Sequence, residues 1–320
     1  MSRGTKTWLI IAAILIVVGM ILFGGMMMSF QWDFTKLSTV KYETNKIEVN
    51  EAYENISVIT NTADVVLVPS ETATSSVVCY EQQNLKHSVE VKDGTLVIRV
   101  EDTRKWYEYI GIQFGTAKIT VYIPKGIYGA LSIKSSTGDV TIPKDVQFES
   151  IDVTGNTGDV KCLASVSEHI KIKLSTGSIQ VKNVSAKAVA LSVTTGSVKV
   201  EALSCSQKLA ISVSTGKTDI KDVTCSSLTS TGDTGDILMK KVIATEKLSL
   251  KRSTGDVKLE SCDAGEIVIK TDTGDVKGSL QSEKIFFAHS DTGHVSVPRT
   301  TTGGKCEITT DTGNIKITIE

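Results

Sequence analysis

The chain has 320 residues, of which 35 are basic and 36 acidic, so its formal net charge is −1. Because the two kinds of charge are interspersed, no basic face for nucleic acid is indicated, and we expect no nucleic-acid partner. Aromatic residues make up only 5% of the chain, so the core must be aliphatic. None of the six cysteines stands in a C-x-x-C pair, which argues against a zinc or thioredoxin-like site.

An uncharged apolar run from Trp8 to Phe30 follows a short basic segment. About 20 apolar residues in a helix cross the hydrocarbon core of a membrane, so we predict a transmembrane helix over residues 8–30. The run ends without an Ala-x-Ala pattern, which favours an uncleaved anchor over a signal peptide. Arg3 and Lys6 favour a cytoplasmic tail over residues 1–7, with the chain from residue 31 outside the cytoplasm. The predicted location is the cell membrane, with a single pass.

The segment after the predicted anchor has two parts. We expect residues 31–54 to form a juxtamembrane linker. Residues 61–68 look like one degenerate coil, and residues 75–130 alternate strongly between apolar and polar positions, which is typical of half-buried strands. Within them, Asp93-Gly94 is a typical two-residue hairpin turn. We interpret residues 55–130 as irregular β coils that cap one end of a repeat region.

A Thr-Gly pair recurs every 19 or 20 residues through the rest of the chain. Aliphatic residues stand at odd positions before each glycine and at even positions after it, as Ile172 and Ile179 do around Gly177. This change of phase indicates a corner between two short strands, and glycine suits a corner because it adopts positive φ freely. The predicted corner glycines are Gly138, Gly158, Gly177, Gly196, Gly216, Gly235, Gly255, Gly274, Gly293 and Gly313.

A single coil of this kind cannot bury its own apolar face. Successive coils stacked about 4.8 Å apart pair as parallel strands and share one continuous core. The sequence therefore predicts an all-β fold, a regular parallel β-solenoid (β-helix) of roughly 20-residue coils over residues 131–320.

Aspartates recur beside the corner glycines. Stacked carboxylates a few ångströms apart could hold Ca²⁺, and the candidate ligands are Asp233, Asp236, Asp256, Asp272 and Asp275. The alternative, which we favour, is that short acidic side chains hydrogen-bond the backbone of the corners. The Asp-Thr-Gly triplets are similar to the motif of aspartic proteases. They would stack along one edge, however, rather than face each other across a cleft. We therefore expect no catalytic residues and no cofactor.

Two other groups of residues are candidates for interactions. Cys205 and Cys225 stand nine residues after their glycines in consecutive coils, where stacked Cα atoms are close enough for a disulfide. Two free thiols in or near the core are the alternative. An aromatic cluster interrupts two strands of the irregular region. It is either a loop packed over the solenoid end or an interaction patch formed by Trp106, Tyr107, Tyr109 and Phe114.

The whole pattern is similar to a known family. The anchor, the segment Trp32-Asp-Phe-Thr-Lys-Leu-Ser-Thr, the strand Asp93-Gly-Thr-Leu-Val-Ile and the Ser-Thr-Gly-Asp-Val coils resemble the bacterial "putative adhesin" family of LiaG-like membrane-anchored proteins. The resemblance covers nearly the whole chain and carries no catalytic signature. It implies a β-strand repeat protein associated with the cell envelope and its stress response.

Three functions compete at this point. The anchor and uniform coils favour a non-enzymatic envelope protein that binds or scaffolds an envelope polymer or a membrane protein. One alternative is a regulatory protein that senses the envelope and acts on a membrane partner. The other is an enzyme acting on polysaccharides, because parallel β-helices also carry such activities; the coils, however, have few insertions to build the walls of a cleft.

Overall fold

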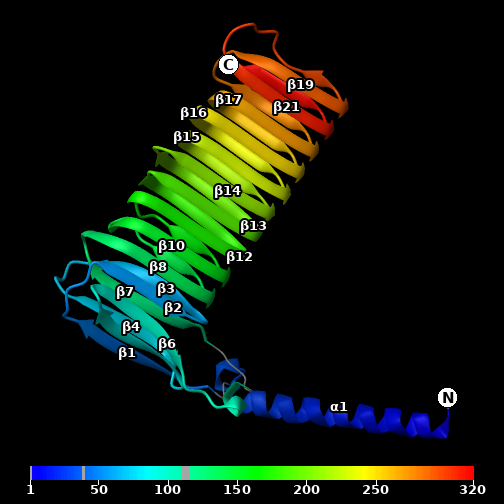
Figure 1. Ribbon diagram of the computed structural model, residues 1–320. Helices are drawn as coiled ribbons and strands as arrows, with labels where there is room; N and C mark the ends of the chain where they lie inside the picture. The colour runs from blue at the N-terminus through cyan, green and yellow to red at the C-terminus, as the bar shows by residue number, and fades with distance from the viewer. Residues whose placement is uncertain (1, 38–39, 110–114) are drawn as a thin grey trace.

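The computed structural model describes residues 2–37, 40–109 and 115–320. It is a rod of stacked β coils, with one long helix leaving one end (Figure 1). This helix, α1 (Arg3–Ser29), begins after Ser2, whose hydroxyl accepts a hydrogen bond from the backbone amide of Thr5. Its most apolar stretch is fully exposed, and α1 is the one helix in the described residues long and apolar enough to cross a membrane. The chain therefore presents an unburied apolar helix at its N-terminus.

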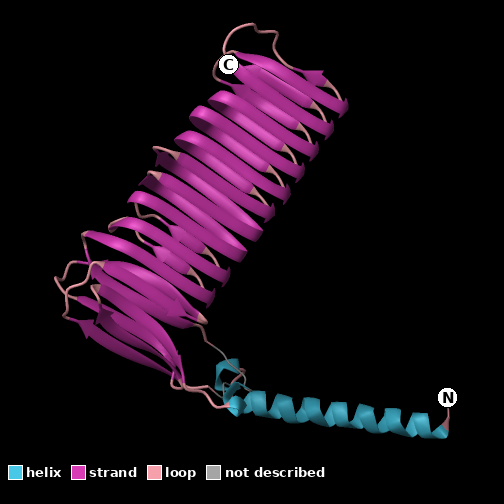
Figure 2. Cartoon of the chain, viewed as in Figure 1, coloured by secondary structure: helices cyan, strands magenta, loops and turns pink. Residues whose placement is uncertain are grey.

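The region next to α1 consists mainly of strands (Figure 2). Its elements, in chain order, are η1 (Phe34–Leu37), β1 (Tyr42–Val49), β2 (Asn55–Thr60), β3 (Ala63–Ser70), β4 (Ser75–Gln82), β5 (Leu85–Lys92), β6 (Thr95–Asp102), η2 (Trp106–Tyr109) and β7 (Ala117–Pro124). β2 and β3 form a coil that pairs in parallel with β6 and β7 on its outer side. β4 and β5 then close the end by antiparallel pairing with β7 and β6. The region is thus a mixed cap rather than a run of simple coils.

Two details of this cap bear on the sequence predictions. The hairpin expected at Asp93-Gly94 joins β5 to β6, with φ of 49° and 70° at its two central residues. The segment 31–54 is more than a linker, because β1 pairs antiparallel with β4 from Tyr42 to Val49. β1 was not predicted from the sequence, because it is an edge strand that buries only one face and therefore contains few apolar residues.

The rest of the rod consists of parallel strands. Their bounds are β8 (Ile127–Thr137), β9 (Val140–Ile142), β10 (Gln147–Thr157), β11 (Val160–Cys162), β12 (Val166–Ala186), β13 (Ala188–Cys205), β14 (Lys208–Thr215), β15 (Thr218–Thr234), β16 (Ile237–Thr254), β17 (Val257–Thr273), β18 (Val276–Leu280), β19 (Lys284–Thr292), β20 (Val295–Ser296), β21 (Gly304–Thr312) and β22 (Ile315–Ile319). Equivalent residues of neighbouring coils stand in register: Ile151 pairs with Leu131 on one side and with Ile170 on the other. The parallel β-solenoid is therefore confirmed.

The last three coils do not stack in the order of the sequence. β21 pairs with β17 on one side and with β19 on the other, and β22 lies in the same way between β18 and β20. In Figure 1 the red C-terminal strand accordingly lies inside the orange strand β19. At the other end, β2 likewise lies between β6 and β8. At the C-terminal end the chain thus passes over one layer and returns to fill it, whereas at the N-terminal end it forms the β2–β3 layer first and later crosses it to continue with β8.

The corner glycines face the backbone of the neighbouring coil. All ten have φ between 121° and 156°, and a Cβ on Gly216 would lie 1.6 Å from the carbonyl oxygen of Gly196. Both the conformation and the close approach therefore require glycine. A second corner, which the sequence did not reveal, lies six residues later in five coils, at residues with φ of 51° to 54°: Asn183, Ala202, Asp222, Lys241 and Ser261.

Candidate functional site

The aspartates that follow the corner glycines connect neighbouring coils. The amide of Asp256 donates to Asp236 Oδ1 at 3.1 Å, and the amide of Asp275 donates to Asp256 Oδ1 at 2.8 Å. The amide of Asn314 continues the ladder to Asp275 Oδ1 at 2.7 Å. This backbone hydrogen bond and the ion pair with Lys277 hold the pKa of Asp275 below its usual value. These contacts favour the backbone role of the aspartates over calcium binding.

The two remaining calcium candidates lie on the other side of the corners. Asp233 is exposed, and its charge acts on the nearby Arg252. Asp272 is half-buried two residues before Gly274. Among the described residues, the one group of three metal-ligating side chains with ligand atoms within 4.8 Å of one another lies elsewhere, in the N-terminal cap.

A groove of about 450 Å³ crosses four consecutive coils beside the aspartate ladder. One row of its lining consists of register partners that point outward from successive strands: Asp219, Leu238, Lys258 and Lys277. A second row consists of the residues directly after the corner glycines: Lys217, Asp236, Asp256 and Asp275. The groove thus presents cations, carboxylates and one exposed apolar side chain at positions that repeat from coil to coil. Such a surface suits an extended polar ligand better than a compact one.

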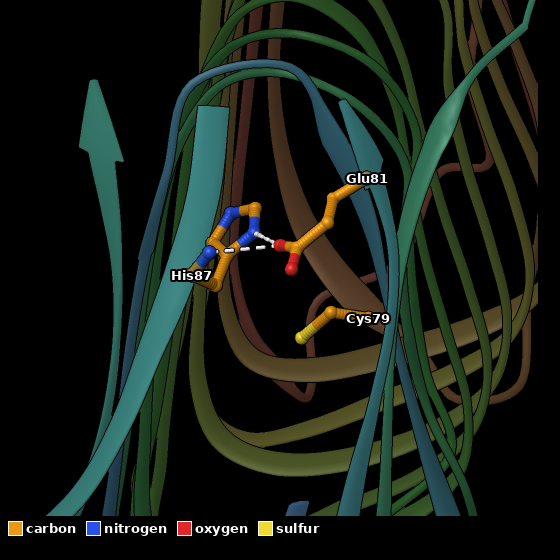
Figure 3. A group of neighbouring side chains, drawn as sticks. All are labelled: Cys79, Glu81 and His87. Carbon is orange, nitrogen blue, oxygen red and sulfur yellow. Dashed lines mark hydrogen bonds and ion pairs between the residues drawn. The ribbon is translucent and has the colours of Figure 1, made fainter. Parts of the chain in front are cut away.

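A buried polar cluster in the cap joins four strands, and Figure 3 shows three of its members, Cys79, Glu81 and His87. Glu81 Oε2 accepts a hydrogen bond from the backbone amide of His87 at 2.8 Å and lies 2.7 Å from its Nδ1. Asn45 on β1 donates to Glu81 Oε1 at 2.8 Å, and Thr60 on β2 lies 3.0 Å from His87 Nε2. The Glu81 and His87 side chains are only 2% and 3% exposed. The cluster therefore ties β1, β2, β4 and β5 together.

The same cluster contains the donor types of a zinc site. Cys79 Sγ, a Glu81 carboxylate oxygen and a His87 ring nitrogen lie close enough to share one ion. Each polar group other than the thiol already has a protein partner, however, and burial raises the pKa of Cys79 to about 12. The contacts of the cluster fit a structural role.

Arg252 is the least expected residue of the core. Its side chain is fully buried at a position that Val193 and Val213 occupy in other coils. Nη1 donates to the Val213 carbonyl at 3.1 Å and Nη2 to Thr218 Oγ1 at 2.7 Å, while Nε and the buried Ser230 Oγ have no partner. Burial lowers the pKa of Arg252. The position is inward by the repeat pattern, but the pattern did not single out Arg252, because arginine side chains are almost never fully buried.

The other candidate residues lie apart from the groove. Cys205 and Cys225 are free and buried, so the two-thiol alternative describes them, and burial raises the pKa of Cys225 to about 12. Trp106, Tyr107 and Tyr109 lie on η2, in the cap from which α1 leaves, and Trp106 is 77% exposed. Phe114 falls outside the described residues.

The fold defines a class: parallel β-solenoids with a glycine corner in each regular coil, here preceded by an apolar helix long enough to cross a membrane. Within it, the family described as Toastrack DUF4097 matches residues 53–207 and 206–320, which together are most of the chain. The protein belongs to that family.

Solved structures share the fold at low sequence identity. A "putative adhesin" from Parabacteroides distasonis is 15% identical, with 88% of this chain and 98% of that chain covered and a TM-score of 0.50. A "putative adhesin" from Bacteroides fragilis is 18% identical, with 87% and 97% covered and a TM-score of 0.44. A "putative lipid binding protein" from P. distasonis is 13% identical, with 86% and 97% covered and a TM-score of 0.41. No curated protein matches the chain.

Proposed function

We propose that this protein is a non-enzymatic binding rod of the cell envelope, anchored by α1 and carrying its solenoid outside the cytoplasm. The unburied apolar helix at one end supports the anchor. The names of the solved structures, adhesins and a lipid-binding protein, describe roles of the same kind. Its location is then the cell membrane, with residues 1–7 in the cytoplasm.

The ligand we propose is an extended polymer of the envelope that lies along the groove. The observation that carries this proposal is the repetition of the groove across four coils. A polymer with repeating polar units meets equivalent side chains at every coil, about 4.8 Å apart, so weak contacts add along its length. Lys217, Lys258 and Lys277 can pair with anionic groups of the polymer, while the aspartates can accept its hydroxyl hydrogens.

Co-sedimentation of the detergent-solubilised full chain with purified cell-wall sacculi tests the polymer. We expect Leu238→Asp combined with Lys258→Glu to reduce the bound fraction at least about tenfold, because both changes place negative charge in the lining of the groove. Ile243→Asp combined with Lys251→Glu is the matched control. It makes the same type of change outside the groove. Equal loss in both double variants, or no binding by the unaltered chain, would count against the groove.

Anchoring and orientation need a separate test. A reporter enzyme that is active only outside the cytoplasm, fused after Glu320, should be active in cells and sediment with membranes after an alkaline carbonate wash. Removal of residues 1–30 should abolish the sedimentation. Reporter activity only in a cytoplasm-specific fusion would reverse the proposed orientation, and release of the intact chain by carbonate would exclude an integral anchor.

A further inference from the structure

The two ends of the rod differ in how their outermost strands are protected. At the C-terminal end, β19 pairs only with β21 among the described strands, so its other edge has no strand beside it. The inward residues Phe286, Ala288 and Val295 of this outer coil are only partly buried. Their register partners one layer further in, Cys306, Ile308 and Ile315, are completely buried. The apolar core of the rod therefore reaches its C-terminal end without a cover of strands.

The middle of the outer strand also lacks the charges and prolines that protect a sheet edge. Ile285 and Phe287 are 39% and 56% exposed, and no Lys, Arg, Asp or Glu stands between Lys284 and Asp291. A shallow hollow of about 600 Å³ adjoins Phe287. Natural edge strands are usually guarded by charges, prolines or bulges, because open edges pair with other chains.

The opposite end shows such protection. Its edge strand β1 places Lys46 and Glu48 outward, with side chains 59% and 67% exposed. It also carries Glu43, which forms an ion pair with Lys86 on β5. The chain therefore guards one end of the rod with charges along its edge strand and leaves residues 285–290 of the other edge without Lys, Arg, Asp or Glu.

We propose that the β19 edge binds the β19 edge of a second copy of this chain, so that two rods join tail to tail. An edge strand is complementary to itself when two copies run antiparallel about a two-fold axis, because amides of each then meet carbonyls of the other. The outer coil and its loop, residues 283–303, contain two acidic and two basic residues, Glu283 and Asp291 against Lys284 and Arg299. Two copies thus meet without net repulsion.

The charged N-terminal edge limits this assembly to a closed pair, because a filament would need an adhesive edge at each end. α1 leaves the opposite end of the rod from β19 (Figure 1). The two anchors of a tail-to-tail pair therefore lie at its far ends. If the proposed anchoring holds, each pair connects two separate membrane sites; the pairing itself does not depend on that function.

The test uses the full-length chain reconstituted in lipid nanodiscs at one chain per disc and examined by mass photometry and negative-stain electron microscopy. We expect particles in which two discs are joined through one continuous rod. Ile285→Lys and Phe287→Lys should each weaken the pairing at least about tenfold, because like charges then face each other across the two-fold axis. Both side chains are exposed, so folding, followed by circular dichroism melting, should be retained.

Ile243→Lys is the control variant, since this β16 residue is 37% exposed in the middle of the rod and should leave the pairs intact. Single discs at tens of micromolar protein would overturn the proposal. So would pairs that persist in both edge variants, or an equal loss in the control. Two chains in one disc would show association through α1 and would also overturn it.

Discussion

The guanidinium of Arg252 fills the space that a side chain at residue 232 would occupy. The two residues pair across neighbouring coils, and a Cβ built on Gly232 would lie 1.8 Å from Arg252 Nη1 and equally close to the Val213 carbonyl oxygen. The largest buried side chain of the core therefore depends on the smallest residue of the preceding coil. Residues 20 positions apart in the chain are coupled through the stacking of coils.

This coupling predicts a non-additive pair of substitutions. Gly232→Ala should lower the free energy of unfolding by at least about 3 kcal/mol, because the new methyl group overlaps two neighbours. Arg252→Leu should change it by less than about 2 kcal/mol, because removal of a buried charge offsets the lost contacts. In the double variant the cost of Gly232→Ala should fall but not vanish, since the Val213 carbonyl remains close. Urea titrations of the four proteins measure the cycle, and strict additivity would contradict it.

The corner glycines predict a large effect from a single methyl group. Gly216→Ala should destabilise the protein by at least about 3 kcal/mol, since φ of 137° is a glycine conformation and the Cβ would overlap the backbone of the preceding coil at Gly196. Gly126→Ala is the matched control. Its Cβ would have no neighbour closer than 4.0 Å. Similar melting temperatures for the two variants would show that the corner tolerates a side chain.

The second corner predicts a stabilising substitution. Ala202 has φ of 53°, a left-handed conformation that costs an ordinary residue about 1 kcal/mol relative to glycine. Ala202→Gly should therefore raise the melting temperature. Ala190→Gly, on an outward position of the same strand β13, should lower it, because glycine in a strand interior loses more backbone entropy. Thermal melting of the two variants should show shifts in melting temperature of opposite sign. A lower melting temperature in both variants would argue against the left-handed corner.

The buried cluster predicts that one partner cannot be removed alone. His87→Leu should cost about 3–5 kcal/mol, because it leaves the Glu81 carboxylate buried with fewer hydrogen-bond donors. Replacing Glu81 and His87 together with leucine should recover part of that loss. Chemical denaturation of the single and double variants measures both. A double variant less stable than His87→Leu would show that the Glu81–His87 pair adds to the stability of the cap and does not merely provide a partner for a buried charge.

An acid dependence follows from Glu260. Lys240 and Lys258 bind its carboxylate at 2.8 and 2.7 Å and hold its pKa at about 2, below the ordinary 4.5. A lowered pKa in the folded state gives stability that is present above pH 4.5 and is lost as the pH falls through about 2. Glu260→Gln should therefore flatten the decline of melting temperature over this range, and the effect should shrink at high salt. A parallel decline in both proteins would contradict the ion pairs.

Much of the regular rod could be predicted because its cause is local. The alternation around Gly177 places Ile172 and Ile179 inward wherever the coil lies, and each coil can bury them only against a neighbour. The aspartate ladder was less accessible. The sequence indicated backbone hydrogen bonds at the corners, but the carboxylate that accepts from the Asp256 amide is that of Asp236 in the preceding coil, not one in its own turn.

The sequence by itself determined the repeating unit: its length, the apolar positions that point into the core, and its glycine corner. The tertiary structure alone decided the order of layers at both ends, the meeting of Glu81 with His87, and the burial of Arg252. The reason is that every coil presents nearly the same parallel edges, so a local pattern cannot specify which coil adds to which. The loop over residues 297–303 lets the chain pass one layer and return between β17 and β19, and only packing selects that order.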